Sequence, residues 1–276
     1  MTPPDHGHLS VLLDAVCDAL APRSGGLYAD VTLGMGGHAE AILERSSPDG
    51  KLVAIDRDPY AHEVARARLA RFGDRLELHE TTLSDIAGVL NGRRVDGLVA
   101  DLGVSSPQLD DPARGMSFRH EGPLDMRMGT GAERTAWQLV RDLRESELAD
   151  VIYQYGDERA SRPIARAIKR AIEAGAMDTT KHLASAVYRV LGPPRFGKID
   201  PATRTFQALR IAVNDELGEL ERLLAALPDV LADGGVAAII SFHSLEDRLV
   251  KHAFRGNTAL EVVTRKPIDA DEAECE

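Results

Sequence analysis

Short apolar runs alternate with helix-like segments along the first hundred residues. Segments 38–45 and 59–72 have the length and spacing of helices, and Pro59 suits a first helical turn, where its missing N–H costs little. The apolar runs are rich in Val, Leu and Ile and are followed by turn residues; they cover 27–33, 51–56, 76–80 and 95–103. This alternation predicts a parallel sheet covered by helices, the α/β class.

The strand pattern disappears from Gln108 to about Thr205. Helical segments follow one another there, at 146–155, 164–174 and 182–191. We therefore predict an α/β domain in two parts, 1–107 and 206–276, interrupted by a helical insertion at 108–205.

The α/β pattern resumes after the insertion. Asn214 is a predicted N-cap, and the leucines from Leu217 to Leu231 form one apolar stripe that predicts a core-facing helix. A turn at 233–235 leads into a predicted strand at 236–241. Ser244 with Asp247 three residues later resembles a capping box, which predicts a helix to Phe254.

The charge of the chain is unevenly distributed. The formal net charge is −11. The segment from Arg159 to Arg210 contains 11 Lys and Arg residues and only three acids, so it carries +8 and the rest of the chain carries −19. Bulk electrostatics argue against a protein that coats nucleic acid, because phosphate binding needs clustered cations. The basic segment is either a solvated helix face or a polyanion contact.

The sequence contains no predicted membrane helix, signal sequence or cysteine cluster. No stretch approaches the roughly 18 apolar residues of a membrane helix, and Met1–Gly7 lacks a signal sequence, so we expect a cytosolic protein without membrane contact. Cys17 and Cys275 are too far apart to suggest a disulfide framework or a metal site. Cys17, in an apolar-periodic segment, is predicted to lie in the core.

Glycines follow the first predicted strand in the segment Asp30-Val-Thr32-Leu-Gly34-Met-Gly36-Gly37-His38. There the backbone must turn tightly and can approach a ligand closely. The spacing is G-x-G-G rather than the G-x-G-x-x-G of dinucleotide-binding proteins, which makes a nicotinamide cofactor less favoured. The alternative is a tight turn without a ligand.

Asp56 ends the second predicted strand, 22 residues after Gly34. This is close to the spacing of about 20 at which an acid accepts hydrogen bonds from ribose hydroxyls. Alternatively, Asp56 or Asp58 caps the next helix. Glycines and acid together favour a nucleoside cofactor, and S-adenosylmethionine has a ribose but no phosphate.

The fourth predicted strand runs into Asp101 and is followed by Gln108, at the sheet edge where α/β proteins hold ligands. Asp101 could accept a hydrogen bond from an exocyclic amine, and Gln108 could contact a base edge or the cofactor. The alternative for Asp101 is a capping or turn acid. The segment 103–107 lacks the second glycine of G-x-S-x-G, so it favours a hydrolase only weakly.

Together these motifs resemble a bacterial family that N4-methylates a cytidine in small-subunit ribosomal RNA, and the resemblance covers nearly the whole chain. The matching segments are Gly36–His38, Asp56–Pro59, Asp101–Asp110, Arg114–Phe118, Pro123–Met128, Tyr155–Arg159, Pro201–Ile211, Asn214–Leu217 and Ser241–Arg248. Two positions depart from the family: Ser10 stands where a proline is usual, and Leu83 where a phenylalanine is common.

The resemblance implies a class I (Rossmann-like) S-adenosylmethionine methyltransferase domain with an inserted all-helical domain that contacts RNA. It implies N4-methylation of a cytidine in 16S rRNA near the decoding centre, in the ribosomal P site region, with 16S rRNA or the small subunit as partner. It also implies an Arg-rich segment beyond the position of Glu276. The cofactor-binding positions that it implies are Gly36, Gly37, His38, Asp56, Leu83, Asp101 and Gln108.

Asp101 and His243 are the candidate catalytic residues, although the motif around His243 is as well suited to capping a helix. No metal is expected. The target base must be single-stranded or flipped, and Phe118, Phe206 or Phe242 could stack on it unless they lie in the core. Two other functions stay open, a nicotinamide-dependent oxidoreductase and a non-catalytic RNA- or nucleotide-binding protein. The oligomeric state also stays open, with a homodimer among the candidates.

Overall fold

The computed structural model describes residues 10–129 and 131–270, which form two compact units. Of the described residues, 10–103 and 219–270 belong to the first unit and the rest belong to the second. Cys275 and the segment Met1–Gly7 lie outside the described residues.

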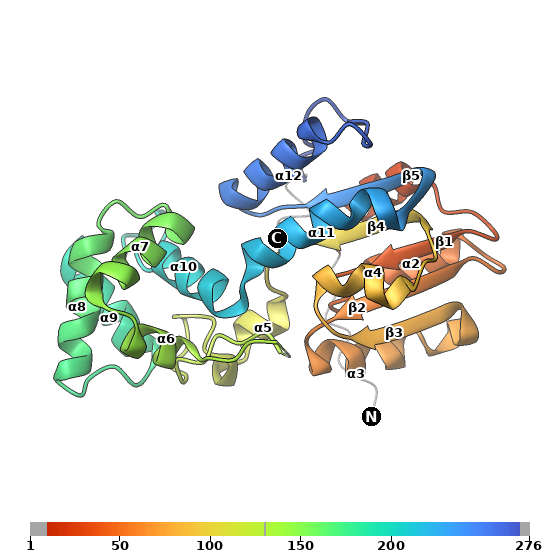
Figure 1. The fold of residues 1–276 in the computed structure, drawn as a ribbon. Helices are drawn as coiled ribbons and strands as arrows, with labels where there is room; N and C mark the ends of the chain where they lie inside the picture. Colours follow the sequence, from red (N-terminus) through yellow and green to blue (C-terminus); the bar gives the residue numbers. More distant parts are fainter. Residues whose placement is uncertain (1–9, 130, 271–276) are drawn as a thin grey trace. The chain divides into compact units, whose positions relative to one another are not determined.

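A five-stranded sheet forms the centre of the first unit (Figure 1). Its strands are β1 (Leu27–Asp30), β2 (Lys51–Asp56), β3 (Leu76–Glu80), β4 (Val95–Asp101) and β5 (Leu231–Ile240). The order is β3-β2-β1-β4-β5, and every pair is parallel. The carboxyl ends of the strands therefore meet at one edge, and strand order reverses beside β1, where open α/β sheets hold their ligands. The predicted α/β class is confirmed.

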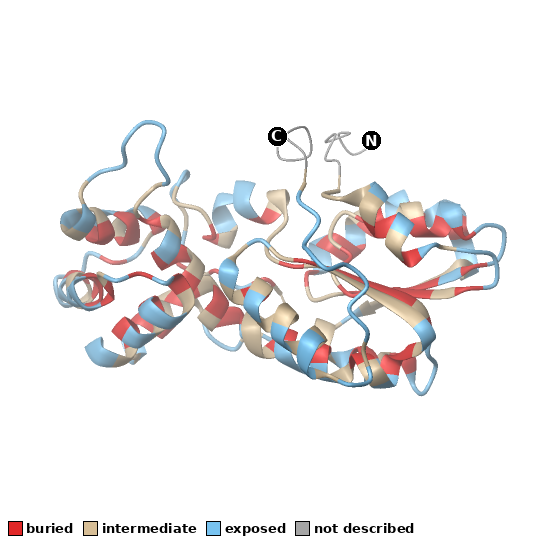
Figure 2. Ribbon diagram, turned by 90° about the horizontal axis from the view of Figure 1, so that it is seen from above, coloured by how far each residue is buried: buried red, intermediate tan, exposed pale blue. Residues whose placement is uncertain are grey.

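Helices cover both faces of this sheet. One face packs against α1 (Leu13–Leu20), α2 (Gly37–Arg45) and α3 (Pro59–Arg68), and the other against α4 (Ile86–Leu90), α11 (Glu216–Val230) and α12 (Ser244–Gly256). Two short 3-10 helices, η1 (Ala70–Arg75) and η2 (Leu83–Asp85), flank β3. Figure 2 shows buried residues along the strands and the sheet-facing sides of the helices. Cys17 is buried in this core, as predicted.

The second unit is helical. Its elements are α5 (Ser106–Asp110), η3 (Pro112–Arg114), α6 (Ala136–Asp142), α7 (Glu145–Gly156), α8 (Ser161–Glu173), α9 (Thr180–Leu191) and α10 (Thr203–Asn214). They enclose a core of their own that includes Ile152, Ile168 and Leu183. No described helix of either unit is both long enough and apolar enough to cross a membrane.

The second unit extends further along the chain than the predicted insertion at 108–205, because α10 packs on α7. A Cβ at Gly156 would lie 2.5 Å from the carbonyl oxygen of Arg204, so only glycine permits this approach. Helix α10 therefore shares its core with the helical unit rather than with the sheet, and Leu209 and Val213 belong to that core.

Three local predictions in the last third of the chain are wrong. Asn214 ends α10 instead of capping α11: its Nδ2 donates to Met126 O at 2.7 Å, and its Oδ1 accepts from Met128 N at 2.8 Å. His243, not Ser244, is the N-cap of α12. Strand β5 begins at Leu231 rather than 236, because Leu231 already pairs with Val95 before a register shift.

Candidate cofactor and active site

The glycine turn follows β1 directly. Gly34 (φ 48°) and Gly36 (φ 79°) adopt the left-handed conformation that favours glycine, and Gly36 occupies the N-cap position of α2. Leu33 N donates to Ile55 O of β2 at 3.0 Å, which holds the turn against the neighbouring strand. The tight strand-to-helix turn is thus as predicted, with Gly37 and His38 as the first two residues of α2.

Asp56, the last residue of β2, faces this turn. Its Oδ2 accepts from Gly34 N at 2.8 Å, and its Oδ1 accepts from Asp58 N at 2.8 Å. Burial raises the pKa of Asp56, and the two N–H donors oppose that rise. Each carboxylate oxygen keeps a second lone pair, so Asp56 could still accept from ribose hydroxyls.

The predicted helix-capping role belongs to Asp58 rather than to Asp56. Asp58 is the N-cap of α3, with its side chain accepting from Tyr60 N at 3.1 Å and Pro59 at the first helical position. Asp56 is therefore not needed as a cap.

Asp101 ends β4 at the same edge. Its N–H donates to Thr32 Oγ1 at 2.6 Å, which ties it to the glycine turn, and its Oδ2 lies 4.0 Å from Nδ1 of His38. Its Oδ1 is buried and has no hydrogen-bond partner among the described residues. Burial, and then the charge of Glu246, raise the pKa of Asp101 to about 7.

His38 is buried beside Asp101. Its Nε2 lies 3.1 Å from the carbonyl oxygen of Val11, so this nitrogen must carry the proton and donate. Burial lowers the pKa of His38, which keeps the ring neutral and leaves an Nδ1 lone pair on the side of Asp101. The geometry suits a residue with a structural role beside Asp101 rather than one that supplies charge.

Asp30, the last residue of β1, is a site residue to which the sequence motif gave no role. It is 1% exposed, its Oδ1 accepts from Thr32 N at 3.1 Å, and its Oδ2 has no partner within the described chain. Burial, and then the charges of Asp101 and Asp56, raise the pKa of Asp30 to about 7. Its position at the end of a strand beside the reversal of strand order is the signal that could have identified it.

The chemistry of the edge suits a cationic nucleoside. Buried polar atoms are almost always hydrogen-bonded, and the free oxygens of Asp30 and Asp101 are the kind of acceptors that a ligand with donors or a positive charge would satisfy. Three carboxylates at adjacent strand ends also favour a cation over a phosphate. No group of three or more metal-ligating side chains occurs in the part of the chain that the structure describes.

Leu83 and Gln108 are the other two predicted cofactor contacts. Leu83 begins η2 after β3 and packs against the core of the first unit, and the next residue, Ser84, donates its N–H to Glu219 Oε2 at 3.2 Å. Gln108 belongs to the second unit, where it is buried and its Oε1 accepts from Ser105 N at 3.1 Å. Contact of either residue with a cofactor stays a prediction.

His243 begins α12. Its Nδ1 accepts from Glu246 N at 3.4 Å, and its buried Nε2 lies 3.2 Å from Glu246 Oε1 without a hydrogen-bond partner in the described chain. Glu246 is buried, and its Oε2 accepts from Phe242 N at 2.9 Å. This geometry supports the capping alternative for the motif, and a catalytic role for His243 stays a prediction.

The three predicted stacking residues have different surroundings. Phe118 and Phe206 pack edge to face, with ring centroids 5.2 Å apart, in the core of the second unit. Phe242 is 58% exposed and lies against Gly103, two residues after Asp101. Phe242 is therefore the one of the three that is available to a base.

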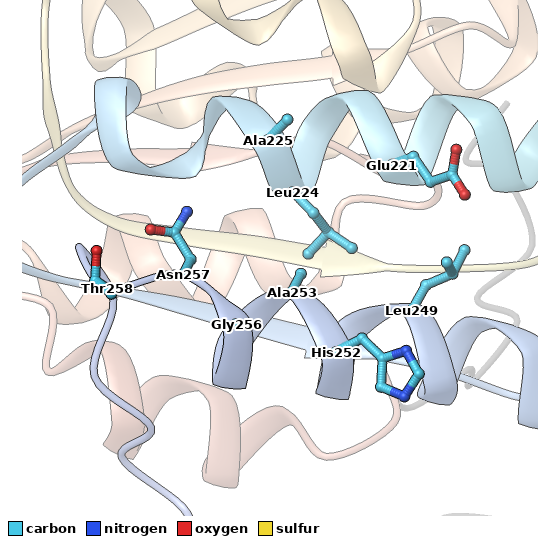
Figure 3. Close-up of a pocket in the computed structure, with 9 residues that line it drawn as sticks. All are labelled: Glu221, Leu224, Ala225, Leu249, His252, Ala253, Gly256, Asn257 and Thr258. Atoms are coloured by element: carbon cyan, nitrogen blue, oxygen red, sulfur yellow. The ribbon is translucent and has the colours of Figure 1, made fainter.

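A separate groove lies between α11 and α12 (Figure 3). Leu224 of α11 and Ala253 of α12 point towards each other across it, and Glu221 and His252 line it. None of the predicted site residues lines this groove.

A parallel sheet with a glycine turn after β1 and buried carboxylates at the ends of β2 and β4 is typical of α/β enzymes that bind a nucleoside cofactor. The chain belongs to the MraW methylase family, whose model matches residues 5–276. Family membership favours methyl transfer over the oxidoreductase alternative.

The chain is similar over almost its full length to proteins named ribosomal RNA small subunit methyltransferase H. It is 55% identical to the protein from Sorangium cellulosum over 272 residues, covering 98% of this chain and 86% of that protein. It is 52% identical to the protein from Synechococcus sp. strain CC9605 over 276 residues, covering 98% and 92%.

Solved structures match only in part. An S-adenosylmethionine-dependent O-methyltransferase from Thermotoga maritima is 18% identical, with a TM-score of 0.29, over 33% of this chain and 34% of that chain. An rRNA methylase from Streptococcus thermophilus is 20% identical, with a TM-score of 0.28, over 37% and 57%.

Proposed function

We propose that this protein uses S-adenosylmethionine to methylate N4 of a cytidine in 16S rRNA, near the decoding centre in the P site region of the small subunit. The observation that carries the proposal is Asp101, whose buried Oδ1 has no partner in the described chain at the edge where cofactor and base must meet. The relatives named small subunit methyltransferase H support the substrate. Because the proposed substrate is ribosomal, we also propose that the protein acts in the cytosol.

Each residue at the sheet edge would contact a different part of the cofactor. Gly36 and Gly37 provide the turn that a ligand can approach, Asp56 would accept from the ribose hydroxyls, and Leu83 would pack against the adenine. Asp30 would face the positive part of the cofactor with its free Oδ2. His38 and Gln108 complete the set of proposed contacts. When bound, S-adenosylmethionine supplies an electrophilic methyl group.

Asp101 would orient the cytosine amine and accept its proton. Its ionised carboxylate would accept one N–H of the amine, which orients the nitrogen lone pair for an in-line displacement. The methylated nitrogen carries an excess proton, and Oδ1 of Asp101 would take it. A pKa of about 7 suits this proton transfer, because the group can accept and release a proton near neutral pH.

The target base must leave its stack before N4 can reach Asp101. Phe242 offers an exposed ring close to the end of β4, so we propose that the extruded cytosine stacks on it. The helical unit, which contains the basic segment 159–210, would hold the surrounding RNA.

Methyl transfer from radiolabelled S-adenosylmethionine to unmodified small subunits tests the proposal, with the modified base then mapped. Label on N4 of a single cytidine is expected. Label on protein or lipid, or on another base, would contradict the substrate, and binding of RNA without any transfer would support the binding-only alternative.

A further inference from the structure

On the basis of the proposed RNA substrate, we propose that the loop between α9 and α10 binds single-stranded RNA by stacking a base on Phe196. Arg195 and Lys198 would contact the phosphates on either side of that base. The proposal names one loop of the helical unit as its RNA contact, instead of the whole basic segment 159–210.

A β-turn forms the tip of this loop. Lys198 N donates to Arg195 O at 3.1 Å, and Gly197 between them has φ 68°, as the third residue of a type II turn requires. The second position of the turn is Phe196, and the two cations occupy its first and last positions, whose Cα atoms lie within about 7 Å in such a turn. The turn thus sets one aromatic ring between two positive charges.

The side chains of the tip face solvent. Phe196 is fully exposed, and the next apolar residue, Ile199, is 82% exposed. Arg195 and Lys198 are exposed too, and neither makes an ion pair with any residue that the structure describes. The other two phenylalanines of this unit pack against each other in its core, so Phe196 is the phenylalanine that this unit leaves without a packing partner.

Hydrogen bonds hold the two ends of the loop in place. Tyr188 Oη lies 3.0 and 2.9 Å from the two carboxylate oxygens of Asp200 and donates to them, and Asp200 Oδ1 also accepts from Ala202 N at 2.7 Å. Burial and the Asp200 carboxylate raise the pKa of Tyr188 to about 12, so this donor stays protonated. Because these hydrogen bonds fix the start of the segment that follows the tip, the loop loses less conformational entropy when the tip binds RNA.

Charge and chemistry favour RNA as the occupant. The loop lies within the segment that carries +8 in a chain whose remainder carries −19, so a polyanion is attracted here. An aromatic ring beside unpaired cations is the arrangement that binds single strands, because every base has a face that can stack. Duplex RNA offers phosphates but no free base face.

Binding of fluorescein-labelled oligocytidylate to the full chain, measured by anisotropy at several salt concentrations, tests this assignment. Phe196→Ala is expected to weaken binding about tenfold without changing the salt slope, and Phe196→Trp to restore it. Arg195→Ala with Lys198→Ala is expected to lower the slope of log K against log salt by about 1.4, since each phosphate contact contributes about 0.7. Duplex RNA should respond to the cation variants and not to Phe196→Ala.

Matched controls are Tyr153→Ala, an exposed aromatic residue on α7, and Arg66→Ala, an exposed cation on α3. Both should bind RNA as the unchanged chain does. Unchanged oligocytidylate affinity in Phe196→Ala would overturn the proposal, as would an effect seen only with intact small subunits, which would assign the tip to a protein. A dimer that dissociates in Phe196→Ala would assign it to a second copy.

Failure of this proposal is separate from failure of the proposed function. If the unchanged chain methylates small subunits and Phe196→Ala binds RNA normally, the loop assignment fails alone. If RNA binding depends on Phe196 but no methyl group is transferred to small subunits, the proposed function fails and the loop assignment stands.

Discussion

The backbone N–H of Gly34 donates to Oδ2 of Asp56 at 2.8 Å, although the two residues are 22 positions apart in the chain. The bond joins the turn after β1 to the end of β2. The same carboxylate accepts from Asp58 N, so one side chain organises both loops at the centre of the proposed cofactor site. Cofactor affinity should therefore be sensitive to this residue.

Asp56→Ala should weaken S-adenosylmethionine binding on the order of 10- to 100-fold, because it removes charged acceptors from two backbone donors and from the ribose. Isothermal calorimetry measures this directly. Asp58→Asn is the matched control, since asparagine can still cap α3 and cofactor affinity should stay the same. Tight binding by Asp56→Ala would remove the ribose contact from the proposal.

Asp101→Ala should keep most of the cofactor affinity and lose turnover by about 100-fold or more, because the amine loses its orienting acceptor and its proton acceptor. Asp101→Asn should lose turnover similarly, since an amide can orient the amine but cannot take the proton. Single-turnover methylation of small subunits gives the rates. Unchanged methylation in either variant would exclude Asp101 from the chemistry.

The rate should rise with pH through the titration of Asp101. Its pKa of about 7 lies above the ordinary 3.8, so at pH 6 and below the group is mostly protonated and cannot take the proton from the amine. Positive charge from a bound cofactor would shift this limb towards lower pH. A pH profile of kcat/KM for the RNA, with cofactor saturating, locates the limb; a profile without an acid limb at any pH where the protein stays folded is not compatible with this role.

Asp30→Asn should stabilise the cofactor-free protein at high pH. The folded pKa of Asp30 is about 7 against an ordinary 3.8, so between these values the folded chain binds a proton that the unfolded chain has lost. The contribution of Asp30 to the free energy of unfolding therefore falls as pH rises from about 4 to about 7. The free energy of unfolding of the variant should exceed that of the unchanged chain by roughly 2–4 kcal/mol at pH 8 and by little near pH 4. Urea unfolding at the two pH values measures the difference, and cofactor affinity should fall in the same variant.

Substitution of His243 separates capping from catalysis. Asparagine is a strong N-cap residue, so His243→Asn should keep both α12 and methyl transfer, while His243→Ala should lower the free energy of unfolding by about 1 kcal/mol. Thermal unfolding and turnover are measured together. If His243→Asn folds normally but does not turn over, His243 has a catalytic role.

Much of the α/β unit could be predicted from the chain alone. The β2 and β3 bounds match the predicted runs, and Pro59 begins α3 as expected. Buried parallel strands read as uninterrupted apolar runs, and a turn after each run marks where it ends, so these features are local. Asp56 and Asp101 were likewise recognisable as strand-end acids.

Features that depend on packing between distant segments were predicted poorly. Asn214 has the composition of an N-cap, but its amide instead binds the backbone of Met126 and Met128, 86 to 88 residues earlier. The boundary after residue 205 was misplaced because α10 packs on α7 through Gly156. Neither contact leaves a periodic signal in the sequence.

The sequence by itself determined the α/β class, the glycine turn and the acids at the strand ends, because strand and turn preferences act over a few neighbouring residues. Only the tertiary structure decided which carboxylate oxygens are free. Asp58 takes the helix cap, Asp56 ties two loops together, and Asp30 and Asp101 each keep a buried oxygen without a partner in the described chain. Burial holds the pKa of Asp30 and of Asp101 near 7, helped by the charges of Asp101 and Asp56 at Asp30 and by the charge of Glu246 at Asp101, and these environments exist only after the chain has folded.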